Sequence, residues 1–187
     1  MPKITEARIA ILATDGFEQV ELTEPLEKLR AAGATVDVVS TKPGTITGWD
    51  QDHWDKEIPV DKELSQVRTS DYDALVLPGG QINPDKLRSD PKVVSFVREF
   101  FNSKKPLAAI CHAPWLLIEA DVVRDRDVTS YKSIKTDVIN AGGKWHDEEV
   151  VVHQALITSR NPGDLPAFIA KIIEEVEEGR HEDRKVA

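Results

Sequence analysis

The chain has 187 residues, of which 40% are hydrophobic and 30% are charged, so it is long enough for one domain with a sizeable core. Its net charge of −9 argues against a general nucleic-acid-binding protein, because a phosphate backbone is met by clustered lysine and arginine. One cysteine, Cys111, excludes an intrachain disulfide and a thiolate-only metal site. The start lacks a signal-peptide pattern and no apolar run approaches the roughly 20 residues of a membrane span, so we expect a cytoplasmic protein without membrane partners.

The predicted elements alternate between strands and helices along the chain. An apolar run at residues 7–14 is typical of a strand buried on both faces, and residues 20–33 have helical spacing that ends at Gly33. Further strands are predicted at residues 34–40, 73–80, 106–110, 127–131, 149–153 and 155–159, and further helices at 89–103, after Cys111, at 133–142 and at 161–179. This alternation predicts one α/β domain over residues 1–187 with a mostly parallel sheet and a frayed tail at 180–187.

One polar segment, residues 47–67, breaks this alternation. It contains two tryptophans and lies between the second and third predicted strands. We interpret it as a surface excursion, such as a hairpin, that offers a contact surface to another subunit.

Three segments are predicted to meet at the carboxyl edge of the sheet, where ligands bind in doubly wound folds. They are the turn at residues 15–18, the turn at 78–80, and Cys111 with His112. A cysteine between a strand and a helix is exposed like the nucleophile of a hydrolase elbow, and the positive helix end lowers its pKa. Backbone amides of the turns, including that of Gly80, then form an oxyanion hole. The alternative is that Cys111 is a small buried hydrophobic residue.

The neighbouring polar residues also have two interpretations. His112 is a candidate general base, or a helix-cap residue facing solvent. Glu18 and Glu21 share one face of a first helical turn, where a carboxyl near the thiol would have a raised pKa, although acidic residues are common at helix starts.

We expect neither a metal nor a cofactor. The other histidines show no metal-ligand spacing, and the glycine turn lacks a nucleotide-binding pattern. These histidines are His53, His146, His153 and His181.

These motifs resemble a known family. The turn GFEQVEL, the strand end LVLPGG, the elbow AICHAPWLLIEA, the run VTSYKSIKTDVINAGGKW and the segment LITSRNPGDLPAF, in this order, are similar to the PfpI-like intracellular cysteine peptidases and stress proteins. This family lies within the class I glutamine amidotransferase-like superfamily and is related to the Parkinson-disease protein deglycase.

The resemblance implies a flavodoxin-like three-layer sandwich with Cys111 at a strained nucleophile elbow. It also implies that Glu21 hydrogen-bonds the thiol, that Glu18 lies at the pocket or a dimer interface, and that a third acid reaches His112 from a neighbouring subunit. Asp85 falls nearest to that third position, in a loop that is one residue longer. Ala113 replaces the family's usual glycine, and its methyl group is expected to narrow the oxyanion pocket or alter access to the thiol.

The resemblance further implies three functions that share one cysteine. The first is a cofactor-independent enzyme of stress defence that acts on reactive carbonyls or glycated substrates, of glyoxalase or deglycase type. The second is an intracellular cysteine peptidase whose site is completed in a homodimer or larger homo-oligomer. The third is a non-catalytic sensor of oxidative stress that works through oxidation of Cys111.

Overall fold

A seven-stranded sheet forms the centre of the computed structural model, which describes residues 3–186. Its strand order is β11 (Val151–His153), β12 (Leu156–Ser159), β8 (Leu107–Ile110), β7 (Ala74–Leu77), β1 (Arg8–Leu12), β3 (Thr35–Ser40) and β6 (Lys62–Glu63). Every neighbouring pair is parallel except β11 with β12. The predicted α/β fold with a mostly parallel sheet is therefore confirmed.

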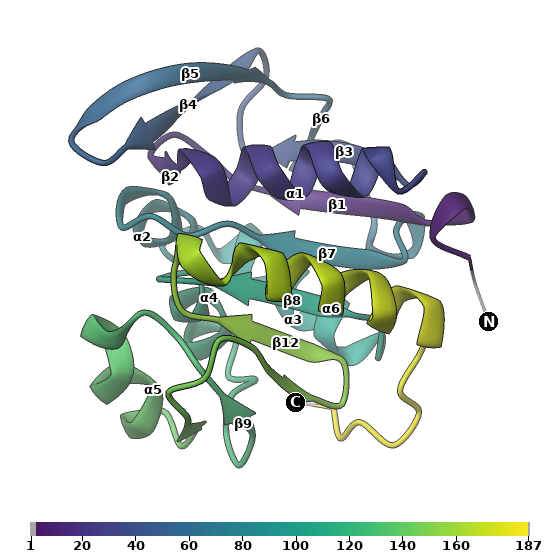
Figure 1. Cartoon of the computed structure of the whole chain (residues 1–187), viewed down its shortest axis with the longest axis vertical. Helices are drawn as coiled ribbons and strands as arrows, with labels where there is room; N and C mark the ends of the chain where they lie inside the picture. The colour runs from purple at the N-terminus through teal and green to yellow at the C-terminus, as the bar shows by residue number, and fades with distance from the viewer. Residues whose placement is uncertain (1–2, 187) are drawn as a thin grey trace.

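Helices cover both faces of this sheet and make a three-layer molecule (Figure 1). One face carries α1 (Gln19–Ala31) and α6 (Leu165–Glu178), and the other carries α2 (Ile82–Arg88), α3 (Pro91–Asn102), α4 (Pro114–Glu119) and α5 (Lys135–Asn140). Side chains of β1 alternate between the two hydrophobic cores, Ile9 and Ile11 on the α1 side and Ala10 and Leu12 on the α3 side. Burial on both faces explains the uninterrupted apolar sequence of this strand.

The polar excursion is a hairpin, as predicted. Strand β4 (Thr45–Asp50) pairs antiparallel with β5 (His53–Pro59), and the short β2 (Phe17–Glu18) joins β4 from the other side. The rings of Trp49 and Trp54 meet edge to face with centroids 5.3 Å apart. Figure 1 shows this ribbon extending beyond the sheet next to the start of α1.

One predicted strand is shorter than expected, and one observed helix was not predicted. The predicted strand at 127–131 is only β9 (Asp127–Val128), which pairs with β10 (Lys144–Trp145) outside the main sheet. Helix α2 was not predicted, because its seven residues include Pro84 and follow a glycine turn. Within residues 3–186, no helix has both the length and the apolar character of a membrane span.

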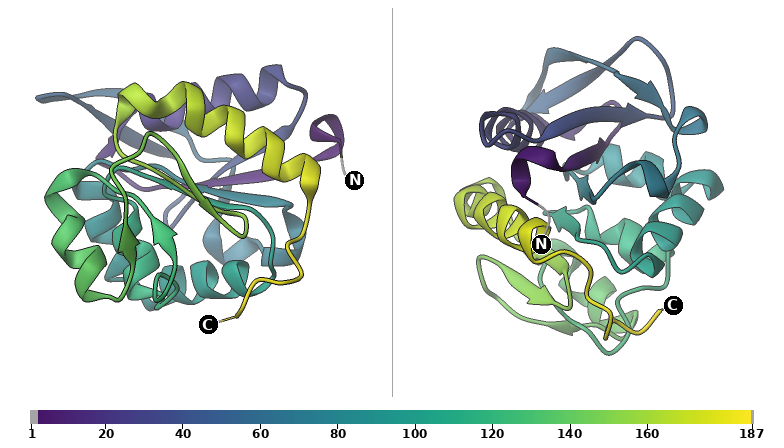
Figure 2. Two further views of the ribbon diagram at one scale, coloured as in Figure 1. Left: turned by 60° about the horizontal axis from the view of Figure 1, so that its bottom comes forward. Right: turned by 90° about the vertical axis from the view of Figure 1, so that its right-hand side faces the viewer.

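The C-terminal tail is packed rather than frayed, which corrects the sequence-based expectation for residues 180–186; Ala187 lies outside the described residues. Arg184 is only 2% exposed, and its guanidinium donates to the carbonyls of Phe101, Lys105 and Gln154. Figure 2 shows the yellow segment leaving α6 and turning back along the domain.

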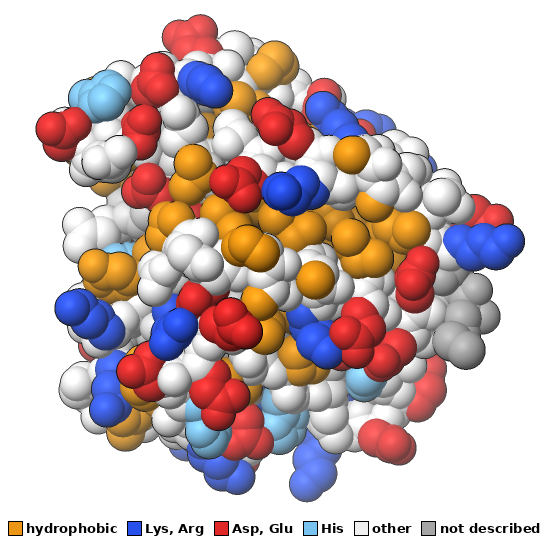
Figure 3. Space-filling view, in the orientation of Figure 1, with side chains coloured by type: hydrophobic (Ala, Val, Ile, Leu, Met, Phe, Trp, Pro, Cys, Tyr) orange, Lys and Arg blue, Asp and Glu red, His pale blue; other side chains and the backbone are white. Residues whose placement is uncertain are grey.

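On the face in Figure 3, hydrophobic side chains gather in a band over α1 and α6.

Candidate active site

Cys111 occupies a strained turn between β8 and α4. Its φ of 63° lies in the left-handed region, which costs a non-glycine residue on the order of 1 kcal/mol or more. Two backbone hydrogen bonds hold this conformation: the Cys111 N–H donates to Ser159 O at 3.0 Å, and the Tyr131 N–H donates to Cys111 O at 2.8 Å. The chain therefore forces the thiol out at the carboxyl edge of the sheet, in the elbow geometry expected from the sequence.

The sulfur lies among polar groups although its residue is only 6% exposed. Its Sγ is 3.1 Å from Nδ1 of His112, and the backbone N–H groups of Gly80 and His112 donate toward it. Gly79 is required at this approach, because a Cβ there would lie 2.6 Å from Cys111 Cβ and 2.5 Å from Glu21 Oε2. The two turns predicted to converge therefore pack directly against each other.

Glu21 is a fully buried carboxyl beside the thiol. Its Oε2 accepts a hydrogen bond from the Gly79 N–H at 2.8 Å. Its Oε1 is buried and has no hydrogen-bond partner of normal geometry within residues 3–186, although the carboxyl and the Cys111 thiol interact. Burial first, and the charge of Glu18 second, raise the pKa of Glu21 to about 8. The carboxyl is therefore protonated at neutral pH and can donate a hydrogen bond.

The thiol pKa moves in the opposite direction to the sequence-based expectation. Burial raises the pKa of Cys111, the charge of an ionised Glu21 raises it further, and the Gly80 and His112 amides lower it. Helix α4 begins only at Pro114, three residues after the cysteine. The positive end of this helix therefore lowers the thiol pKa by less than burial raises it. When Glu21 is protonated its charge is absent, and its hydrogen bond then favours the thiolate, so the two groups titrate as a coupled pair.

His112 is a neutral base next to the thiol. Burial lowers the pKa of its ring to about 4. Its Nε2 lies 3.0 Å from Ser133 Oγ, and Tyr131 stacks on the ring with centroids 4.7 Å apart. The tautomer that donates from Nε2 to Ser133 leaves the Nδ1 lone pair directed at Sγ. His112 is thus placed to accept the thiol proton.

Asp85 does not join this group within the chain. Its carboxyl lies on α2, 60% exposed, and pairs with Arg88 at 2.7 Å. The Arg88 guanidinium in turn lies over the Trp115 ring, 4.3 Å from its centroid. The hydrogen-bond partner of His112 Nε2 is Ser133 instead. A role for Asp85 in a neighbouring subunit stays a prediction.

The structure places Ala113 in the hydrophobic core. Its side chain is fully buried in the hydrophobic core on the α3 and α4 side of the sheet. Its backbone N–H donates to Ile110 O at 3.0 Å and is not available to an oxyanion. The side chain therefore packs in the core, and Ala113 is not among the residues that line the cavity above the sulfur.

A cavity of about 470 Å³ opens above the sulfur. Cys111 lies at its base, and four more of its lining residues were predicted as site residues from the sequence: Glu18, Glu21, Gly80 and His112. The other lining residues are Gly16, Trp49, Gln51, Gln81, Ile82, Tyr131 and Pro162. Burial, and then the charge of Asp50, raise the pKa of Glu18. The cavity has the size of a small-molecule site, and the hairpin provides part of its wall.

Two residues of the site escaped sequence reasoning. Tyr131 was placed in a strand of the sheet, and Ser133 was placed in a helix, with no chemistry assigned to either. The structure puts both at the His112 ring, at the start of the 3₁₀ turn Lys132–Ile134. Their only sequence signal is the polar run SYKS within a predicted strand–helix junction.

The sequence matches the DJ-1/PfpI family over residues 7–175. It is 47% identical over 163 residues to the Protein/nucleic acid deglycase 2 of Escherichia coli strain K12, covering 86% of this chain and 92% of that protein. It is 44% identical over 163 residues to the General stress protein 18 of Bacillus subtilis strain 168, covering 86% and 92% respectively.

A solved structure shows the same fold. A protein of Anabaena variabilis with DJ-1/ThiJ/PfpI-like and ferritin-like domains superimposes with a TM-score of 0.87 at 34% identity. The match covers 96% of this chain and 52% of that two-domain chain. With the motifs, the elbow and the sequence match in agreement, the chain belongs to the DJ-1/PfpI family.

Proposed function

We propose that this protein is a cofactor-independent cysteine enzyme of stress defence that acts on reactive carbonyls or their early adducts, of glyoxalase or deglycase type. One observation carries the proposal: the thiol of Cys111 faces a neutral histidine nitrogen at 3.1 Å and a buried protonated carboxyl at the base of a cavity of about 470 Å³. The names of the relatives support enzymatic deglycation and a link to stress.

The first chemical step follows from the positions of the groups. Sγ of Cys111 forms a bond to the aldehyde carbon while its proton passes to Nδ1 of His112. The carbonyl double bond breaks and leaves an alkoxide, which takes a proton to give a neutral hemithioacetal. The His112 pKa of about 4 makes the imidazole a weak base in the free site, so it holds the proton only transiently and returns it to the alkoxide.

Glu21 supplies the second proton-transfer group. Its Oε1 is buried with no hydrogen-bond partner of normal geometry within residues 3–186, so a substrate hydroxyl or carbonyl beside the thiol would meet an unpaired carboxyl oxygen. A carboxyl with a pKa of about 8 exchanges protons readily at neutral pH. In a glyoxalase-type reaction its ionised form, the minor form at neutral pH, is the candidate base that takes the proton from the hemithioacetal carbon and then returns it to the adjacent carbon.

The test is consumption of methylglyoxal by the wild type and by Cys111→Ala and Cys111→Ser. We expect both variants to lose turnover while their circular dichroism spectra stay unchanged. Iodoacetamide provides an independent check, because Cys111 is the only thiol in the sequence and its alkylation should abolish activity in parallel. Normal turnover by Cys111→Ala would refute the proposal.

The peptidase alternative requires an acid to orient His112. Within the chain Ser133 occupies that position and Asp85 pairs with Arg88, so an acid would have to come from a second subunit. Asp85→Asn separates the two functions: we expect unchanged carbonyl consumption, whereas a peptidase completed by Asp85 would lose peptide cleavage.

The redox-sensor alternative also uses Cys111. Mass spectrometry after mild peroxide treatment decides it: stoichiometric oxidation of this thiol in a protein without aldehyde turnover would favour sensing over catalysis.

A further inference from the structure

The end of α6 brings together three side chains that can ligate a cation, far from the cysteine site. Glu175 and Glu178 lie one turn apart in the last turns of the helix. The chain then reverses at Gly179, with φ of 87°, and brings His181 back over the helix end. Nε2 of His181 lies 2.9 Å from Glu175 Oε2 and 3.6 Å from Glu178 Oε2.

One of these carboxylate oxygens is buried and makes no hydrogen bond. Glu175 is 4% exposed, and its Oε2 has no hydrogen-bond partner of normal geometry in the described chain. The close contact with His181 is an ion pair only when that ring is protonated, and it lacks hydrogen-bond geometry. A buried carboxylate oxygen without a donor is costly, and a metal ion placed between it and the imidazole nitrogen would satisfy both.

The excess negative charge at the end of α6 also favours the binding of a cation. Four glutamates stand in the last five residues of α6, at the negative end of the helix, and no basic residue lies in its last turn. Lys171 pairs with Glu174 at 2.7 Å. The Arg184 guanidinium is close enough to interact with Glu175, but its hydrogen bonds go to backbone carbonyls.

We propose that Glu175, Glu178 and His181 bind a divalent transition-metal ion of the Zn²⁺ type and thereby fasten the C-terminal segment to α6. Imidazole nitrogen and carboxylate oxygen are both ligands of Zn²⁺, and a water molecule would complete four-coordination. Spacing along the sequence gave no sign of this site, because the histidine reaches the helix only after the turn at Gly179. Glu178 is half-exposed and free to adjust its carboxylate to the ion.

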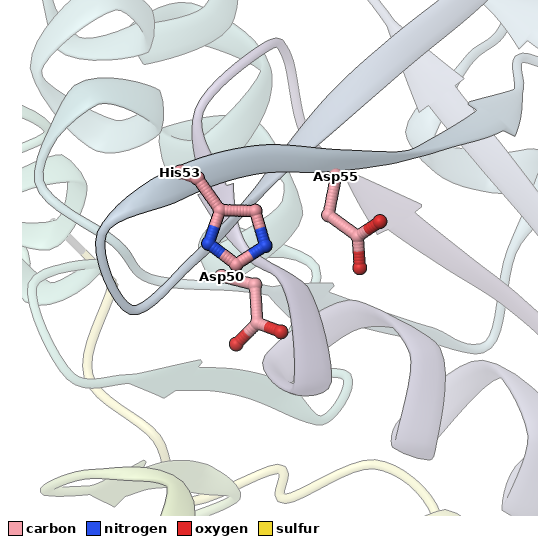
Figure 4. A group of neighbouring side chains, drawn as sticks. All are labelled: Asp50, His53 and Asp55. Atoms are coloured by element: carbon pink, nitrogen blue, oxygen red, sulfur yellow. The ribbon is translucent and has the colours of Figure 1, made fainter.

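A second cluster serves as the internal control. Asp50, His53 and Asp55 point toward one another across the β4–β5 hairpin (Figure 4). Its His53 and Asp55 are exposed, His53 pairs with Asp52 at 2.8 Å, and Asp55 accepts a hydrogen bond from Gln19 at 2.8 Å. No buried, unpartnered atom marks this cluster within residues 3–186, so we propose no ion there.

Isothermal titration calorimetry with ZnCl₂ tests the site. We expect Glu175→Gln and His181→Gln each to raise the dissociation constant for Zn²⁺ by more than about tenfold. Even the loss of an outer-shell partner of a metal ligand lowers metal affinity by that factor. Glu174→Gln removes the same charge one residue away, His53→Gln removes the hairpin ligand, and Cys111→Ser removes the thiol; all three should bind like the wild type. The proposal would be overturned if the wild type showed no saturable binding. It would also be overturned if His53→Gln or Cys111→Ser lost binding while Glu175→Gln kept it.

Limited trypsin digestion tests the fastening. Arg180 and Lys185 are cleavage sites in the segment that the ion would hold. We expect Zn²⁺ to slow cleavage there severalfold in the wild type and in Glu174→Gln, but not in His181→Gln. His181 is partly exposed, so its variant is expected to fold, which circular dichroism without metal verifies. Equal protection of His181→Gln would contradict the assignment.

Discussion

The raised pKa of Glu21 predicts a specific dependence of stability on pH. In the unfolded chain this carboxyl titrates near its usual 4.5, and in the folded protein near 8. Between these values the folded state holds a proton that the unfolded state has released, so the free energy of unfolding falls as pH rises. Over the full interval the effect is at most about 5 kcal/mol, at about 1.4 kcal/mol for each pKa unit.

His112 restricts the useful pH window. Its pKa of about 4 in the folded protein lies below its usual 6.5, so its contribution has the opposite sign and stability rises with pH between those values. Above pH 6.5 the ring is largely neutral in both states. From pH 6.5 to 8 Glu21 should therefore lower the free energy of unfolding by about 2 kcal/mol.

Glu21→Gln isolates this contribution, because the amide is nearly isosteric, cannot ionise, and its oxygen can still accept from the Gly79 N–H. Urea unfolding of both proteins at pH 6.5, 7, 7.5 and 8, at one protein concentration, gives the free energies. We expect the wild type to lose about 2 kcal/mol more than the variant across this window. Parallel pH profiles for the two proteins would show that Glu21 ionises normally and would refute the argument for a protonated carboxyl.

Three further substitutions test the packing of the site and of the tail. Gly79→Ala places a methyl group 2.6 Å from Cys111 Cβ and should cost about 1–3 kcal/mol in urea unfolding, so a neutral effect would contradict the close approach. Ser133→Ala removes the partner of His112 and should lower kcat/KM for methylglyoxal about tenfold at unchanged stability; an unchanged rate would exclude a positioning role. Arg184→Ala removes three hydrogen bonds and should lower the free energy of unfolding by about 3 kcal/mol, which a fall in the midpoint of thermal unfolding would show. An unchanged midpoint would indicate a frayed tail.

The sequence was sufficient to predict the parts of the site that depend on local pattern. Cys111 follows a strand that is apolar on both faces, and the end of such a strand lies at the ligand-binding edge. Glu21 lies in the first turn of a helix that starts at the same edge, so its place beside the cysteine followed from the fold and from the family motif. The hairpin at residues 47–67 was recognisable because its polar sequence interrupts the alternation.

Contacts between distant segments could not be read in this way. Ser133 and Tyr131 reach His112 because β9 leaves the main sheet, which residues 127–131 do not indicate by themselves. The direction of the Cys111 pKa depends on burial, and burial depends on how the turn at Gly79 packs over the sulfur. Arg184 looked like part of a charged, frayed tail, since its carbonyl partners are at least 30 residues away.

The most direct test of the central claim is carbon-13 NMR of labelled methylglyoxal incubated with the protein in the presence of EDTA. Chelation removes any bound metal, including an ion at the end of α6, and leaves only side-chain chemistry. We expect the wild type to convert the label to a 2-hydroxy acid and Cys111→Ala to leave it unchanged. Conversion by Cys111→Ala at the wild-type rate, or no conversion by the wild type, would contradict a cofactor-independent reaction at this cysteine.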